Sequence, residues 1–189
     1  MAKVSKAEML TAVLNSIQAS GWDAIVLNKS HPFRISMYRG DSRVILLCYI
    51  WNLTHGGYPR DPNELRIQVT GVDRFAIESG AKTLVLGFSD DEKMFAGFDV
   101  TKHRISMSGR SPSFQIRRET LQHAKTTDFY PQTRQNNEIA IAFRPEFFAT
   151  YVNELEALHG SAQHPQDIVA VTQIADTNTT NIQDIPAGP

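Results

Sequence analysis

The sequence of 189 residues contains a single cysteine and no long hydrophobic run. Cys48 lies inside the apolar run VILLCYI, so we interpret it as a small core residue, and alone it cannot form an intrachain disulfide. The longest apolar stretch is far shorter than the ~20 residues that span a bilayer, and the start does not resemble a signal peptide. We therefore expect a cytoplasmic protein with no membrane partner, since reducing compartments disfavour disulfides.

The sequence also lacks the motifs of several common sites. Structural zinc needs clustered Cys and His ligands, whereas the six histidines are scattered along the chain. Neither a G-x-x-x-x-G-K nor a G-x-G-x-x-G phosphate loop is present, and there is no G-x-S-x-G nucleophile elbow. We therefore expect no metal and no organic cofactor.

Acidic residues form two short groups that a metal-dependent nuclease could use. Asp61 and Glu64 are three residues apart, but they precede Leu-Arg rather than a residue and a lysine. The group 90–92, followed by Lys93, lies where a tight hairpin turn is expected, and turns commonly contain charged residues. A nuclease built on these acids remains an alternative. We prefer a chain without catalytic residues of its own.

Charge is unevenly distributed, although the formal net charge is −1. After Glu156 the chain has no Lys or Arg but three Asp residues. Between Lys102 and Arg134, by contrast, there are seven basic residues and only two acidic ones. A locally basic segment on a nearly neutral body is typical of a directed polyanion-binding face, and an ordinary solvated surface is an equally weighted alternative.

Short strands dominate the predicted secondary structure. A capped amphipathic helix is predicted over 5–21, with Ser5 as N-cap and Glu8 three residues later. Six strand-like segments follow, at 22–28, 33–40, 42–53, 65–71, 82–89 and 93–100. A short helix at 117–124, a polar loop, and a strand that breaks into a helix at Pro145 complete the pattern. Because regular β-α-β alternation is missing, we predict an α+β, mainly β fold: a curled sheet or open pseudobarrel with flanking helices.

The composition changes near the C-terminal end. We predict one domain over 1–158 and a linker-like tail over 159–189, which is poor in charge and rich in Thr, Asn, Gln and Pro. Four apolar residues of this tail, which could instead form an edge strand, are Ile168, Val169, Val171 and Ile174.

The stretch YPRDPNELRIQVTG, residues 58–71, begins as a turn-rich loop, and from Leu65 to Thr70 its apolar and polar residues alternate. If Leu65 and Ile67 face the core, Arg66 and Gln68 share the opposite face of the strand, because side chains alternate along a strand with a period of two. This stretch thus predicts an exposed Arg/Gln face directly after a turn-rich loop.

A Ser- and Arg-rich passage over 103–118 contains a second such strand, SFQIR at 113–117. Its apolar Phe114 and Ile116 are predicted to point inward and its three polar side chains outward. A third polar segment, TRQNNE, covers 133–138. For each segment alone, an ordinary exposed polar strand or loop is the competing interpretation.

Arg, Gln and Asn make paired hydrogen bonds to base edges, whereas Ser and Lys commonly bind phosphates. Together the segments therefore favour a surface that binds double-stranded DNA. The residues predicted to read bases are Arg60, Asn63, Arg66, Gln68, Arg110, Ser113, Gln115 and Arg117. The residues predicted to contact phosphates are Lys102, Arg104, Ser106, Ser108, Arg118 and Arg134.

Aromatic residues near the first polar loop offer a further alternative. Tyr49, Trp51 and Tyr58, with His55 between them, could line a pocket that stacks an extruded base. We favour a core role for Tyr49 and Trp51, because both belong to a long apolar strand.

The chain resembles the amino-terminal domains of bacterial restriction endonucleases from about Arg43 to Tyr151. The most specific segments of the resemblance are ELRIQ, GFDVTKH with SPSFQI, and AFRPEFF. The resemblance implies a non-catalytic DNA-recognition module with a pseudobarrel similar in kind to plant B3-like domains. It also implies a separate nuclease domain, often of the HNH type, fused after Pro189. A nucleotide or small-ligand sensor domain is the remaining alternative.

Overall fold

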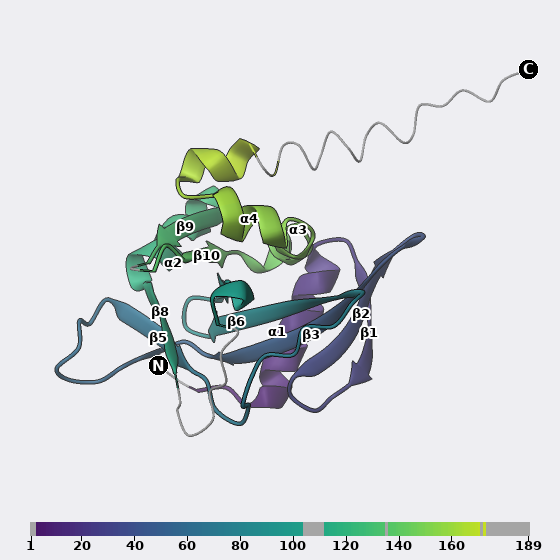
Figure 1. The fold of residues 1–189 in the computed structure, drawn as a ribbon, viewed down its shortest axis with the longest axis horizontal. Helices are drawn as coiled ribbons and strands as arrows, with labels where there is room; N and C mark the ends of the chain where they lie inside the picture. The colour runs from purple at the N-terminus through teal and green to yellow at the C-terminus, as the bar shows by residue number, and fades with distance from the viewer. Residues whose placement is uncertain (1–2, 104–111, 135, 171, 173–189) are drawn as a thin grey trace, which may run out of the picture.

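Two β-sheets and a set of flanking helices form the fold (Figure 1). The computed structural model describes residues 3–103, 112–134, 136–170 and 172. The larger sheet has the strand order β1-β2-β3-β6-β7-β10-β9, in which only β3 and β6 run parallel, and the smaller sheet has the order β4-β5-β8.

The strands, several of them short, have the bounds β1 (Asp23–Asn28), β2 (Phe33–Arg39), β3 (Ser42–Asn52), β4 (Thr54–His55), β5 (Glu64–Gln68), β6 (Ala81–Ser89), β7 (Met94–Phe98), β8 (Ser113–Arg117), β9 (Phe129–Thr133) and β10 (Ile139–Phe143). The helices are α1 (Lys6–Ala19), α2 (Arg118–Thr127), α3 (Phe148–Asn153) and α4 (Leu155–Ser161), with 3-10 turns η1 (Val100–His103) and η2 (Pro145–Phe147). The predicted α+β, mainly β class with flanking helices is confirmed.

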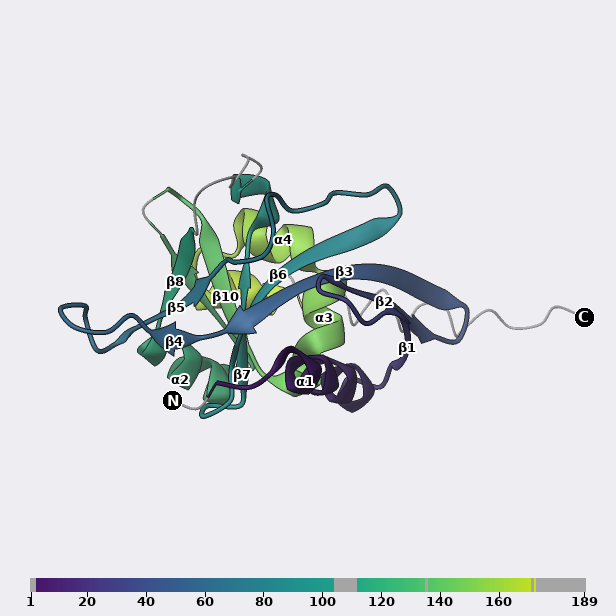
Figure 2. The ribbon, with the colours of Figure 1, turned by 90° about the horizontal axis from the view of Figure 1, so that it is seen from below.

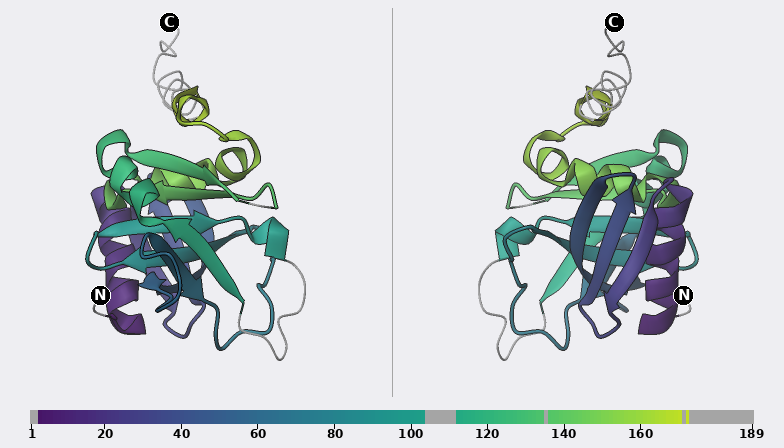
Figure 3. Two further views of the ribbon diagram at one scale, coloured as in Figure 1. Left: turned by 90° about the vertical axis from the view of Figure 1, so that its left-hand side faces the viewer. Right: turned by 90° about the vertical axis from the view of Figure 1, so that its right-hand side faces the viewer.

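The seven-stranded sheet is covered on both faces, so the domain has three layers (Figures 2 and 3). One face packs against α1, α3 and α4, which contribute apolar side chains such as Val13 and Tyr151 to one cluster. The other face packs against the three-stranded sheet and α2, through residues that include Ile67 and Leu121. The small sheet therefore has one buried face and one face left for solvent.

Local sequence signals explain where α1 begins and ends. The Ser5 side chain accepts a hydrogen bond from the Glu8 backbone N–H, and Glu8 accepts one from the Ser5 backbone N–H, which completes the predicted capping box. Gly21, with φ of +76°, follows the C-terminal end. Val13 and Ile17 lie on the buried face of the helix, as their spacing predicts.

Two glycines let neighbouring layers approach closely. A methyl group at Gly87 of β6 would lie 2.7 Å from Leu53 Cδ2 and 2.8 Å from Ile67 Cγ2, so the three-stranded sheet rests almost on the β6 backbone. A methyl group at Gly97 of β7 would lie 2.7 Å from Tyr151 Cε2, on the opposite face of the same sheet. Contacts this short allow only a hydrogen at these positions.

One strand, β9, was not predicted from the sequence, and the alternative of an edge strand in the tail is wrong for the described residues. Phe129–Thr133 forms the edge strand β9, where a polar loop was expected. Pro131 is tolerated there because an edge strand need not donate every ladder hydrogen bond.

In the predicted tail, residues 165–170 are helical rather than an edge strand, and Ile168 is buried in the core. The part of the predicted tail after residue 172 lies outside the described residues. No helix among those described is both long and apolar enough to cross a membrane.

Replacing Gly97 by Ala should lower the free energy of unfolding by about 1–3 kcal/mol, because the added methyl group overpacks the contact with Tyr151. Chemical denaturation measures this change. Gly160→Ala is the matched control: Gly160 lies within α4 with no atom near the position of a new methyl group, so the substitution should leave stability unchanged or raise it. Equal stability of the two variants would contradict the proposed packing.

Candidate nucleic-acid interface

The outer face of the three-stranded sheet brings together polar residues from two distant parts of the chain. Strands β5 and β8 pair antiparallel, so that Arg66 lies opposite Gln115, and Thr54 of β4 lies on the other side of Arg66. The inward-facing residues of the two strands, all buried, are Leu65, Ile67, Phe114 and Ile116. The alternation predicted for each strand is therefore confirmed, and because β5 and β8 are paired, the polar sides of the two strands form one continuous face.

We define the outer face by the side chains that project from this sheet away from the core: Thr54, Glu64, Arg66, Gln68, Ser113, Gln115 and Arg117. Thr54 was not among the residues predicted from sequence, because a two-residue strand such as β4 is too short to show an alternating pattern. Its place in the face follows only from its pairing with Arg66.

Glu64 organises this face through a single carboxylate oxygen. Its Oε1 atom accepts hydrogen bonds from Arg60 Nη1 and from Gln115 Nε2, each at 3.2 Å. The carboxylate thus links an arginine of the preceding loop to a glutamine of β8. Glu64 was considered from sequence only as a nuclease acid, and its contacts here are those of an orienting group.

The β4–β5 loop, residues 56–63, is ordered by internal hydrogen bonds. His55 Nδ1 accepts from the Gly57 backbone N–H at 3.1 Å, and His55 Nε2 donates to the Asp61 carbonyl at 3.0 Å. Asp61 Oδ1 accepts from the Asn63 N–H at 2.8 Å. A methyl group at Gly56 would overlap the Arg60 side chain and lie 3.2 Å from Arg66 Nε. Two of the predicted base-reading arginines, Arg60 and Arg66, therefore converge at the start of this loop.

A polar groove of about 700 Å³ adjoins the outer face. It lies between β8, α2 and β9, and its lining includes Gln115 and Asn136. The rings of His123 and Tyr130 stack within it, with centroids 4.7 Å apart. Arg117, on its rim, pairs with Glu119 at 3.0 Å. The third polar segment predicted from sequence, 133–138, thus reaches the edge of the same surface.

The predicted phosphate-contacting residues occupy different environments. Lys102 is exposed on η1. Arg118 pairs with Glu92 at 2.9 Å, and Arg134 pairs with the fully buried Glu138, so a carboxylate already engages each of these two guanidinium groups. The other three predicted phosphate contacts, Arg104, Ser106 and Ser108, lie outside the described residues, as does Arg110, which was predicted to read a base.

The aromatic residues do not form a pocket for an extruded base. Tyr49 and Trp51 are buried, their rings stack with centroids 6.3 Å apart, and His31 packs edge-on against both. The preferred interpretation of Tyr49 and Trp51 as core residues is therefore confirmed. Tyr58 lies apart from them, fully exposed in the β4–β5 loop.

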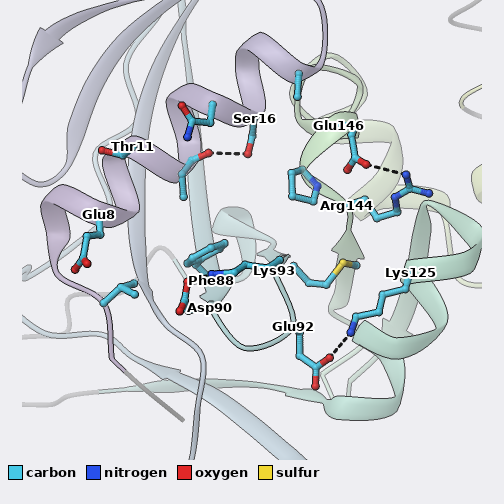
Figure 4. Close-up of a pocket in the computed structure, with 16 residues that line it drawn as sticks. Glu8, Thr11, Ser16, Phe88, Asp90, Glu92, Lys93, Lys125, Arg144 and Glu146 are labelled. Carbon is cyan, nitrogen blue, oxygen red and sulfur yellow. Dashed lines mark hydrogen bonds and ion pairs between the residues drawn. The ribbon is translucent and has the colours of Figure 1, made fainter.

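A second cavity, of about 740 Å³, lies between α1, the β6–β7 turn, α2 and η2 (Figure 4). Phe88 and Met94 contribute to its lining. The three basic side chains on its rim each have an acidic partner, in the pairs Lys93–Asp90, Lys125–Glu92 and Arg144–Glu146. The hydrogen bond from Lys125 lowers the pKa of Glu92. The acids suggested for a nuclease at 90–92 thus include two that are engaged in ion pairs.

Within the described part of the chain, no group of three or more His, Cys, Asp and Glu side chains is placed to hold a metal ion.

The model of a protein family described as methylase-associated X1 matches residues 44–152, more than half of the chain. The chain belongs to the methylase-associated X1 family. The methylase-associated X1 region runs from β3 into α3 and so contains the whole three-stranded sheet. No curated protein and no solved structure is detectably similar to the chain. The family's description fits a domain associated with restriction and modification systems in general.

Stability should fall as the pH is lowered below about 6.5, the usual pKa of histidine. Burial and the nearby charge of Lys6 lower the pKa of His31 to about 4, and burial also lowers the pKa of His159. Because the unfolded chain binds more protons than the folded chain between these pH values, the free energy of unfolding decreases toward pH 4. Urea denaturation at a series of pH values measures this slope.

His31→Gln should flatten the slope between pH 6.5 and 4, because glutamine can still accept the hydrogen bond from the Ile50 N–H but does not titrate. His164→Gln, at an exposed position, is the control and should retain the slope of the unsubstituted protein. An unchanged slope in His31→Gln would show that His31 titrates alike in the folded and unfolded chains.

Proposed function

We propose that this domain binds double-stranded DNA through the outer face of the three-stranded sheet, as the recognition part of a restriction-modification system. The observation that carries the proposal is the pairing of Arg66 with Gln115 across β5 and β8. Arginine and glutamine are the side chains that make bidentate hydrogen bonds to guanine and adenine in the major groove. Membership in the methylase-associated X1 family supports the same assignment.

The dimensions of the outer face suit a groove of DNA. Three strands spaced about 4.8 Å apart are roughly 10 Å across, and the major groove is about 12 Å wide and accepts a β-ribbon. The three cross-strand rows of β5 and β8 present Glu64 with Arg117, Arg66 with Gln115, and Gln68 with Ser113. These rows combine hydrogen-bond donors and acceptors on a surface that a few base pairs would cover.

The contacts of Glu64 prepare these side chains for recognition. An arginine or glutamine that must be ordered on binding loses conformational entropy, and a side chain already held in place loses less. Because Glu64 Oε1 holds Arg60 and Gln115 before DNA arrives, it lowers this cost. We propose that Arg60, Asn63, Arg66, Gln68, Ser113, Gln115 and Arg117 read bases, together with Arg110.

Phosphate contacts would position the duplex on this face. We propose Lys102 as one such contact, with Arg104, Ser106 and Ser108. Arg118 and Arg134 would have to leave Glu92 and Glu138 to reach a phosphate, so we expect smaller contributions from them. Binding should weaken as salt increases, because Lys and Arg displace counterions from DNA.

Cleavage would belong to another domain. The resemblance to amino-terminal domains of restriction endonucleases supports a nuclease, of HNH type, fused after Pro189. We further propose that the domain resembles B3-like recognition domains in its mode of binding, and that it reads either a specific sequence or a methylated base. A binding screen over methylated and unmethylated duplex libraries tests the proposal, and absence of binding to every duplex would refute it.

Arg66→Ala and Gln115→Ala should each weaken binding to the preferred duplex by roughly 1–3 kcal/mol and relax the preference at one base pair. Each substitution removes a side chain that would read a base edge but leaves the buried side of its strand intact. Fluorescence anisotropy with matched and mismatched duplexes measures both effects.

Lys29→Ala is the control for these two variants, because Lys29 is exposed directly after β1, a strand at the far edge of the larger sheet (Figure 1). It should bind like the unsubstituted protein. If Arg66→Ala and Gln115→Ala also left affinity and preference unchanged, the outer face would not be the binding surface.

Lys102→Ala should weaken binding to all duplexes alike and reduce the salt dependence by about one counterion. The reason is that a phosphate contact carries no sequence information. Affinities measured across a range of salt concentrations test this expectation. A change of sequence preference in Lys102→Ala would contradict it.

A further inference from the structure

We infer that Tyr58, at the tip of the β4–β5 loop, stacks on a base of the bound duplex and marks a second contact point beside the outer face. The inference rests on the proposed DNA binding and extends it to a residue that neither the strand pairing nor the family match singles out. Its ligand is the flat face of a nucleobase rather than a base edge or a phosphate.

Tyr58 differs from the other tyrosines of the chain in its exposure. Its side chain is 100% exposed, whereas Tyr49 and Tyr151 are buried and Tyr38 and Tyr130 are half-buried. An aromatic ring in water keeps both π faces available, and nucleobases stack on such rings whatever their sequence. The ring is therefore the group in this loop best suited to contact a base.

The backbone of the loop presents this ring at a turn. The Arg60 N–H donates to the Gly57 carbonyl at 3.0 Å, which places Tyr58 and Pro59 at the two central positions of the turn. The His55 ring holds both sides of the loop, at the Gly57 N–H and the Asp61 carbonyl. The ion pair of Arg60 with Glu64, at 3.2 Å, ties the turn to the first residue of β5.

The position of the loop relates Tyr58 to the outer face. The loop connects β4 and β5, two of the three strands of that face, and it projects beyond them at the left of Figures 1 and 2. Arg60 and Arg66 meet at the start of the loop, beside Gly56. A duplex held by these arginines would therefore meet the Tyr58 ring next to the bases that β5 and β8 read.

The ordering of the loop makes stacking efficient. A flexible loop would lose conformational entropy on binding, whereas a loop already closed by His55 and by the ion pair of Arg60 with Glu64 loses less. To stack on a base of the duplex, the ring would have to enter between two adjacent base pairs and locally unstack them. Such unstacking is easiest at flexible pyrimidine–purine steps, so Tyr58 would add an indirect preference for them.

The experiment uses the full chain and duplexes of the preferred sequence in which a fluorescent purine analogue replaces one base at a time. The unsubstituted protein should change the fluorescence of the analogue at one step, where Tyr58 stacks. Tyr58→Ala should lose that signal and weaken binding roughly 5- to 150-fold, the range typical of one base stacked on an aromatic side chain. Tyr58→Phe, which keeps the ring, should retain both.

A control variant and a comparison with Arg66→Ala separate the possible failures. Ile77→Ala removes an exposed apolar side chain outside the outer face and should bind like the unsubstituted protein. If Arg66→Ala weakens binding but Tyr58→Ala does not, the stacking inference is overturned while the proposed function stands. A Tyr58→Phe variant as weak as Tyr58→Ala, or no fluorescence change at any step, also overturns stacking. Failure of the unsubstituted protein to bind any duplex refutes the proposed function itself.

Discussion

The packing of the three-stranded sheet onto β6 is the constraint on which the candidate interface depends. Ile67 and Leu53 approach the β6 backbone so closely that only a glycine fits at position 87. This contact buries one side of β5, and because strand side chains alternate, it fixes Arg66 and Gln68 on the solvent side. A shift of one residue in either strand would turn the polar row into the core, so the buried apolar side chains determine what the outer face presents.

Charge pairing limits how much of the basic segment is available to a polyanion. Between Lys102 and Arg134 the structure describes five basic residues, and four of them form ion pairs, with Glu119, Glu92 or Glu138. Glu92 alone engages both Arg118 and Lys125. In the proposed DNA binding, electrostatic attraction would therefore depend on fewer side chains than the basic composition suggests. Recognition would rest on oriented hydrogen-bonding groups more than on net charge.

Local sequence patterns correctly predicted the features that depend on residues close together in the chain. The capping box depends on Ser5 and Glu8, which lie within one helical turn of each other. Period-two alternation correctly assigned the inward and outward sides of β5 and β8. The edge strand β9 was missed, because Pro131 and its polar neighbours resemble a loop until β10 supplies the hydrogen-bonding partner.

The sequence by itself determined the class of the fold, most of its strands, and which side of each strand is polar, because these follow from propensity and alternation along the chain. Only the tertiary structure decided that the polar sides of β5 and β8 join, that Thr54 extends them, and that Glu64 orients Gln115. Glu64 and Gln115 are far apart in sequence, and their contact depends on strand pairing, which no local pattern specifies. Tertiary structure also decides the environment of Arg134: the sequence predicts a phosphate contact, but in the fold its guanidinium group pairs with the buried carboxylate of Glu138.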